Sequence, residues 1–286
     1  MPERFSDFSQ LDLADVEERV YTKYDVSRSD ARLAVEYLRC FFNAKRQRPR
    51  QLIILPQIAD WAWHELILDT ERYRSVCSRA LGTFLHHLAT TVNPAELLND
   101  PDIDTRDRAE LEPAGALGRP ELDGSGLRQC FVESMAMMRD IYGLGVGSNP
   151  GEWADAGWDT PAYRLRSAIR IPYHLDENAS TGADRGQSNR TPFLSWLPSR
   201  IVRRFGIPLD AAKHGVQEYS NFFLSLRSPD VKRGYGKCSI LCSIAWEEHI
   251  LWTQRYAEDC SRFLGYFLDH VPRMVFFQTC DAFEAA

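Results

Sequence analysis

The stretch WHELILDTERYRSVCSRALGTFLHH at 63–87 returns later in the chain as WEEHILWTQRYAEDCSRFLGYFLDH at 246–270. Aligned without gaps, 15 of the 27 positions in 63–89 are identical to the residue that lies 183 positions further on. Identity of this extent does not arise by chance and indicates an internal repeat of one structural unit. The apolar residues of the stretch recur at helical spacing, so it predicts a hairpin of two helices.

The similarity continues upstream of this hairpin at an offset of 181 residues. EERVYTKYDV at 17–26 aligns with PSRIVRRFGI at 198–207, and CFF at 40–42 aligns with NFF at 221–223. The change of offset from 181 to 183 indicates a longer loop in the second copy, within RSPDVKRGYGKC. We therefore interpret the chain as a tandem duplication.

The predicted fold class is all-α, with two repeated helical-bundle domains and an irregular middle segment. We expect the first copy at 10–90, a linker with one helix at 91–190, and the second copy at 191–280. In the middle segment, residues 90–125 and 176–191 are rich in charged and turn-forming residues and predict mobile loops. LRQCFVESMAMMRDIYG predicts the one helix, and RSAIRIPY a short strand.

Each copy predicts about four short helices, with boundaries marked by capping residues. In the first copy, a helix at 30–44 follows Ser29 as its predicted N-cap. Asp210 is the predicted N-cap of the corresponding helix in the second copy. The hairpin consists of a helix at 58–68 and another at 71–81. Thr70 is predicted to cap the start of the latter helix, and Gly82 to end it in the left-handed conformation.

Composition and charge narrow the classes of function. The formal net charge is −6, and short basic runs such as AKRQRPR are interpreted as helix ends, so we expect no nucleic-acid partner. No apolar run reaches the roughly 18 residues of a membrane span, so we expect no membrane partner. The polar start MPERFSDFSQ is unlike a secretory signal, and the seven scattered cysteines suit reduced thiols. We therefore expect a cytoplasmic protein.

The candidate site is a metal site of Asp60, His64 and His87. Asp60 and His64 lie four residues apart on one predicted helix, so their side chains can meet. His86 and His87 follow the next helix and can approach the pair, giving a His/His/Asp cluster suited to zinc or iron. Cys77 is predicted to stay out of this cluster, because it shares a buried stripe with Tyr73 and Leu81.

A packing interpretation competes with this metal site. The second copy has Ser243 and Glu247 where the first has Asp60 and His64, while His87 is retained as His270. His249 takes the place of a leucine two positions further on, about 200° around the helix, so it cannot replace His64. Under this interpretation Trp63, Tyr73, His64 and His87 join the helical hairpin by packing and hydrogen bonds.

The stretch LPQIADWAWHELILDTERYRSVCSRALGTFLHH resembles the signature of the glycine-rich domain-containing-protein-like family of bacteria and plants. The matching positions are Asp60, Trp63, His64, Thr70, Tyr73, Cys77, Gly82 and His87. The resemblance covers about 35 residues and extends weakly to LRQCFVESMAMMRDIYG, and the glycine-rich tail of the family is absent. It implies a helical domain and carries no established chemistry.

Three classes of function remain open from the sequence. The leading interpretation is a cytoplasmic binding or adaptor protein, which recognises a protein partner through a cleft between the copies or through the loops 100–125 and 176–191. The alternative is a metal-dependent enzyme that uses the Asp60, His64 and His87 cluster. A small-molecule sensor is the third class, and the sequence does not indicate an oligomeric state.

Overall fold

The computed structural model describes residues 8, 11–24, 26–49, 51, 53–87, 133–134, 136–138, 194–227 and 239–272. These residues are mainly helical and contain no strand, which confirms the all-α prediction. The chain divides into two compact units, Met1–Arg166 with Asp269–Ala286 (unit 1) and Ser167–Leu268 (unit 2). The predicted boundaries at 90/91 and 190/191 lie outside the described residues, as does the predicted strand RSAIRIPY.

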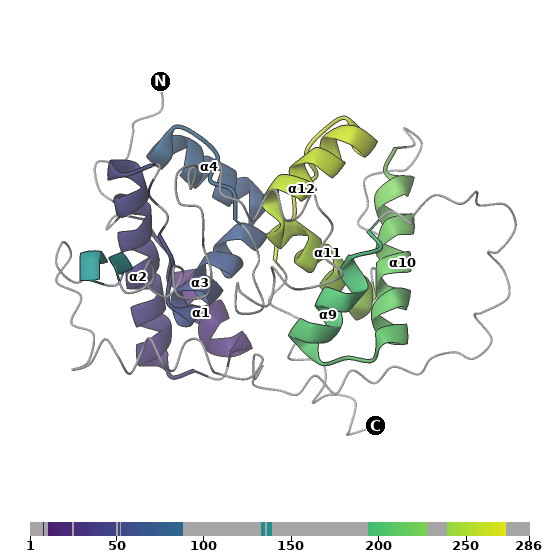
Figure 1. Ribbon diagram of the computed structural model, residues 1–286, viewed down its shortest axis with the longest axis horizontal. Helices are drawn as coiled ribbons and strands as arrows, with labels where there is room; N and C mark the ends of the chain where they lie inside the picture. Colours follow the sequence, from purple (N-terminus) through teal and green to yellow (C-terminus); the bar gives the residue numbers. More distant parts are fainter. Residues whose placement is uncertain are drawn as a thin grey trace, which may run out of the picture. The chain divides into compact units, whose positions relative to one another are not determined.

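Unit 1 is built around one buried helix. Its helices are α1 (Ala14–Lys23), α2 (Arg28–Gln47), α3 (Gln57–Leu68) and α4 (Thr70–Leu81), drawn in purple to blue in Figure 1. Helix α3 packs against all three of the others, and nine of its twelve residues are buried. A helix that is apolar on nearly every side has to be buried, and α3 therefore forms the centre of the unit.

Unit 2 repeats this plan. Its helices are α9 (Leu197–Phe205), α10 (Leu209–Ser225), α11 (Ile240–Leu251) and α12 (Thr253–Asp259), followed by the π-helical turn η3 (Cys260–Leu264), in green to yellow in Figure 1. Helix α11 is the central one, with nine of twelve residues buried and with α9, α10 and α12 packed against it. Its bounds are those of α3 shifted by 183 residues, and α12 with η3 covers the equivalent of α4.

The helix starts differ from the predicted caps. Helix α2 begins after Ser27, whose side chain and Asp30 form a capping box, and Ser29 lies inside the helix. The prediction of Ser29 was wrong because Ser27 has the acidic partner three residues on that a capping box requires. Helix α10 begins after Pro208 without a side-chain cap, so the prediction for Asp210 was also wrong.

The turn between α3 and α4 is capped by Asp69. The Asp69 side chain accepts from the Arg72 backbone N–H, and Thr70 is the first residue of α4, so the predicted cap was one position too late. The Thr70 hydroxyl is used otherwise: it accepts from the His270 backbone N–H at 2.8 Å. The predicted helix end is confirmed, because Gly82 closes α4 with φ 74° in the left-handed region.

A buried carboxylate with two basic partners occurs in both units. In unit 1, Glu65 on α3 lies 3.4 Å from Arg19 Nε and 3.1 Å from Lys23 Nζ. In unit 2, Glu248 on α11 lies 3.4 Å from Arg200 Nε and 2.8 Å from Arg204 Nη1. Both glutamates are almost fully buried, and the close basic partners provide the pairing that a polar side chain needs in the core.

A second polar group is buried in unit 2 alone. The Tyr219 hydroxyl lies 2.9 Å from His249 Nδ1, and His249 Nε2 lies 3.2 Å from the Asp259 carboxylate. The residues at the equivalent positions of unit 1 are buried and apolar: Leu38, Leu66 and Val76. A neutral imidazole that accepts from Tyr219 and donates to Asp259 satisfies all three groups, so this hydrogen-bonded trio replaces packing at one place in the core.

Only a few residues of the middle segment belong to the described part of the chain. Residues 133–134 and 136–138 are helical, within the stretch predicted as the one helix, and Met137 and Met138 are buried. The loops 90–125 and 176–191 lie outside the described residues. Within the described ranges, no helix has the length and apolar character that crossing a membrane requires.

Replacing Glu248 by Gln tests the buried ion cluster of unit 2. Arg200 and Arg204 would remain buried without a carboxylate, and breaking such a cluster costs about 3–5 kcal/mol of unfolding free energy. The matched control is Glu18→Gln, which breaks the exposed Arg28–Glu18 pair and should leave the unfolding free energy nearly unchanged. Equal losses for the two variants in urea unfolding would contradict this assignment.

The trio of Tyr219, His249 and Asp259 predicts acid sensitivity. Burial lowers the pKa of His249 against the opposing effect of Asp259, and Arg255 lowers it further. Below about pH 6.5 the unfolded chain then binds a proton that the folded chain resists, so stability falls as pH drops, by up to about 1.4 kcal/mol per pH unit. Calorimetry from about pH 7.5 to 5 should show this slope in the wild type and a smaller one in His249→Gln. Identical slopes would refute the prediction.

Candidate metal centre

Helix α3 brings Asp60 and His64 together, as the spacing predicts. Pro56 precedes the helix, and Asp60 lies in its first turn, where the positive end of the helix dipole favours a carboxylate. His64 follows one turn later on the same face, and its Nε2 lies 3.2 Å from Asp60 Oδ2. The pair is thus fixed by a rigid buried helix.

His87 reaches the site from the segment that follows α4. Gly82 ends the helix and reverses the chain, and two hydrogen bonds then hold the segment in place. Trp63 Nε1 donates to the Tyr73 hydroxyl at 3.1 Å, and this hydroxyl donates to the Leu85 carbonyl at 2.6 Å. We call this arrangement the Trp63–Tyr73 clamp. It anchors the chain two residues before His87.

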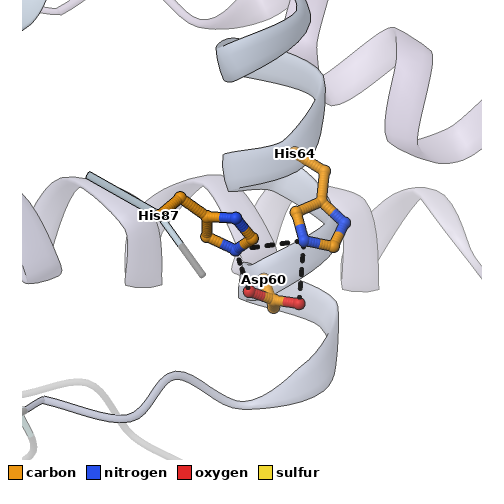
Figure 2. A group of neighbouring side chains, drawn as sticks. All are labelled: Asp60, His64 and His87. Carbon is orange, nitrogen blue, oxygen red and sulfur yellow. Dashed lines mark hydrogen bonds and ion pairs between the residues drawn. The ribbon is translucent and has the colours of Figure 1, made fainter. Parts of the chain in front are cut away.

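Three side chains meet at the site, as Figure 2 shows. His64 Nε2 lies 3.2 Å from His87 Nε2, and the two nitrogens lie 3.2 and 3.3 Å from the two oxygens of Asp60. Both rings are buried, with His64 1% and His87 5% exposed, while the Asp60 side chain is 25% exposed. The site therefore faces solvent on the side of its carboxylate.

With an ionised Asp60, hydrogen bonds alone do not satisfy these three contacts. The Nε2 atom of a neutral imidazole has either a hydrogen or a lone pair, and an ionised carboxylate only accepts. If both nitrogens have hydrogens, the contact between His64 and His87 joins two donors. If one has a lone pair, its contact with Asp60 joins two acceptors. A cation among the three donors removes this conflict, because both lone pairs and the carboxylate then face positive charge.

The spacing of the donors matches a transition-metal site. For bonds of about 2.1 Å, an octahedral ion brings neighbouring donors to about 3.0 Å and a tetrahedral ion to about 3.4 Å. The contacts of 3.2 to 3.3 Å lie between these values. Two histidines and one carboxylate are a donor set found in catalytic zinc sites and in non-haem iron sites. The residues present therefore fit zinc or iron(II).

Two nearby side chains do not belong to this cluster. His86, the other predicted candidate for approach, is exposed and its ring packs on Phe84. Cys77 is fully buried beside Tyr73, as predicted, and burial raises the pKa of its thiol to about 11. A thiol with so high a pKa stays protonated near neutral pH and is a poor metal ligand.

The equivalent positions in unit 2 do not form such a cluster. Ser243 and Glu247 stand in place of Asp60 and His64, and His249 pairs with Tyr219 and Asp259 instead. His270, the counterpart of His87, belongs to unit 1, where its Nδ1 lies 2.7 Å from the Leu68 carbonyl. His87 and His270 thus make different contacts, so the presence of this histidine in both repeats does not favour the packing interpretation.

The sequence did not predict two parts of the site's surroundings. One is the use of the Leu85 carbonyl by Tyr73, although the identity of Trp63 and Tyr73 in both repeats signalled their pairing. The other is the contact of His270 with α3. Both contacts involve backbone carbonyls. Every residue has one, so the sequence does not indicate which carbonyl a side chain will bind.

In the comparisons with known proteins, one family model matches part of the chain. Residues 8–107 match the model of a family described as UCP032817-like. This range includes Asp60, His64 and His87 and covers less than half of the chain. No curated protein and no solved structure matches the chain. The resemblance to the glycine-rich domain-containing-protein-like family therefore stays a prediction.

Proposed function

We propose that Asp60, His64 and His87 bind a divalent transition-metal ion, zinc or iron(II), and that the chain is a metal-dependent enzyme. The observation that supports this most is the convergence of both imidazole Nε2 atoms and both Asp60 oxygens, with contacts of 3.2, 3.2 and 3.3 Å. These contacts conflict as hydrogen bonds and agree with donors around one ion. When bound, such an ion supplies Lewis-acid chemistry.

The number of protein donors favours catalysis over a purely structural role. Structural zinc sites are closed by four protein ligands, whereas catalytic sites have three and leave a position for water or substrate. Among the described residues, only Asp60, His64 and His87 form a group of potential metal ligands. The partly exposed Asp60 gives the site contact with solvent, and the two buried rings exclude water from its other side.

We also propose that the protein is cytoplasmic and that its two units arose by tandem duplication. The described residues contain no disulfide, and Cys40, Cys77, Cys242 and Cys260 are buried thiols, which supports a reducing cytoplasm. The clamp and the buried glutamate recur at equivalent positions, which supports a tandem duplication. Binding of a protein partner, through a cleft between the copies or through the loops 100–125 and 176–191, stays a prediction.

Metal content tests the proposed site directly. We expect the full chain, purified without an affinity tag, to hold about one equivalent of zinc or iron, and His64→Ala and His87→Ala to lose it. His270→Ala is the matched control, since it also removes a buried histidine of unit 1 but leaves the cluster intact. Elemental analysis with circular dichroism separates loss of metal from loss of fold.

The proposal is overturned if the wild type stays free of metal after reconstitution with zinc or, anaerobically, with iron(II). It is also overturned if His64→Ala and His87→Ala retain as much metal as His270→Ala. Lowered thermal stability of the two variants without any difference in metal content would establish the packing interpretation instead.

An open coordination position distinguishes an enzyme from a structural site. We expect the cobalt(II)-substituted chain to change its visible absorption when azide is added, because three protein donors leave room for an added anion. Asp60→Asn keeps the size of the side chain and removes its charge, so it should weaken cobalt binding at unchanged fold. A cobalt spectrum that azide does not alter would indicate a closed, structural site.

A further inference from the structure

The clamp that precedes His87 has a close counterpart in unit 2. Trp246 Nε1 donates to the Tyr256 hydroxyl at 3.1 Å, and this hydroxyl donates to the Leu268 carbonyl at 2.7 Å. The corresponding distances in unit 1 are 3.1 and 2.6 Å. In both units the accepting leucine stands two residues before a histidine. The clamp is thus a repeated device that fixes the chain just before this histidine.

The three donors of the candidate metal centre differ in how firmly they are held. Asp60 and His64 are carried by α3, whose backbone is fixed by its own hydrogen bonds. His87 is carried by a non-helical segment, which has no such internal support. The ordering of this segment therefore determines how much conformational entropy is lost when His87 joins a metal.

The tyrosine hydroxyl is the central atom of the clamp. Tyr73 is 1% exposed, and its hydroxyl accepts from Trp63 and donates to Leu85 at the same time. Burial raises the pKa of Tyr73, so the hydroxyl keeps the hydrogen that it donates. Without this oxygen, both Trp63 and the Leu85 carbonyl would lose a partner, and the segment would be held less firmly.

We infer that Tyr73 is a positioning residue of the metal centre. Its hydroxyl orders residues 85–87, so that His87 Nε2 stands beside His64 and Asp60 before the ion arrives. This inference rests on the proposed function, because it concerns the same site. It goes beyond that proposal by assigning a role in metal affinity to a residue that is not a ligand.

The test compares Tyr73→Phe with Tyr256→Phe in the full chain. Each variant removes one hydroxyl and the same two hydrogen bonds, so both should lower the melting temperature by similar amounts. Zinc affinity, measured by competition with a chromophoric chelator, should fall about 10- to 100-fold in Tyr73→Phe. In Tyr256→Phe it should stay within about twofold of the wild type, because that clamp precedes no metal ligand.

The outcomes distinguish this inference from the proposal beneath it. If the wild type binds no zinc, the proposed function fails, and the inference fails with it. If the wild type binds zinc and Tyr73→Phe binds it equally well, the inference alone fails. If both variants weaken zinc binding equally, the effect follows from general stability, and the positioning role is again refuted. All affinities are measured well below the lower of the two melting temperatures.

Cobalt spectra provide a readout that a purely structural role would not alter. The d–d bands of cobalt(II) depend on the number and type of its ligands. We expect Tyr73→Phe to shift these bands toward those of His87→Ala, because both changes withdraw the same nitrogen. Tyr256→Phe should reproduce the wild-type spectrum. A Tyr73→Phe spectrum identical to the wild type at saturating cobalt and unchanged affinity would refute the inference.

Discussion

Burial of one helix on nearly all sides is the constraint on which each unit depends. Nine of twelve residues are buried in α3 and also in α11, and each of these helices carries two buried ionisable side chains. A charged or polar group in such a place is tolerated only when it is paired. The positions of the surrounding helices therefore reflect more than apolar packing, because they also supply the partners of these polar groups.

The two units pair their buried glutamates in the same way and their buried histidines in different ways. The glutamates at 65 and 248 are matched by two basic residues on the first helix of each unit, α1 and α9, at the same spacing in both repeats. The histidines occupy different positions, 64 in α3 and the equivalent of 66 in α11, which point about 200° apart. His64 therefore meets a carboxylate on its own helix, whereas His249 turns toward α10 and α12. The two units share the same helical plan and differ in where their buried histidines and carboxylates lie.

The sequence predicted those features that depend on spacing within one helix or on repetition. The all-α class, the helix at 58–68, the Gly82 stop and the meeting of Asp60 with His64 all follow from local periodicity. The N-caps were less predictable, because two neighbouring residues at each helix start have a side chain that can cap. Ser27 and Ser29 are such a pair, and so are Asp69 and Thr70. The N-cap is the residue whose side chain reaches a backbone N–H of the first turn. The trio around His249 could not be predicted, because its members come from three separate helices.

The packing and metal interpretations of the repeated stretch both involve His64 and His87, whereas Trp63 and Tyr73 are not metal donors in either. Trp63 and Tyr73 make the same contacts as Trp246 and Tyr256, so these contacts serve the fold of both units, beside the positioning role inferred for Tyr73. The triangle of Asp60, His64 and His87 does not recur, and folding does not require it, since unit 2 closes the same hairpin with serine and glutamate at two of the three positions. Because the same helical plan forms in unit 2 without these side chains, the comparison of the two units supports a role for them in unit 1 other than folding.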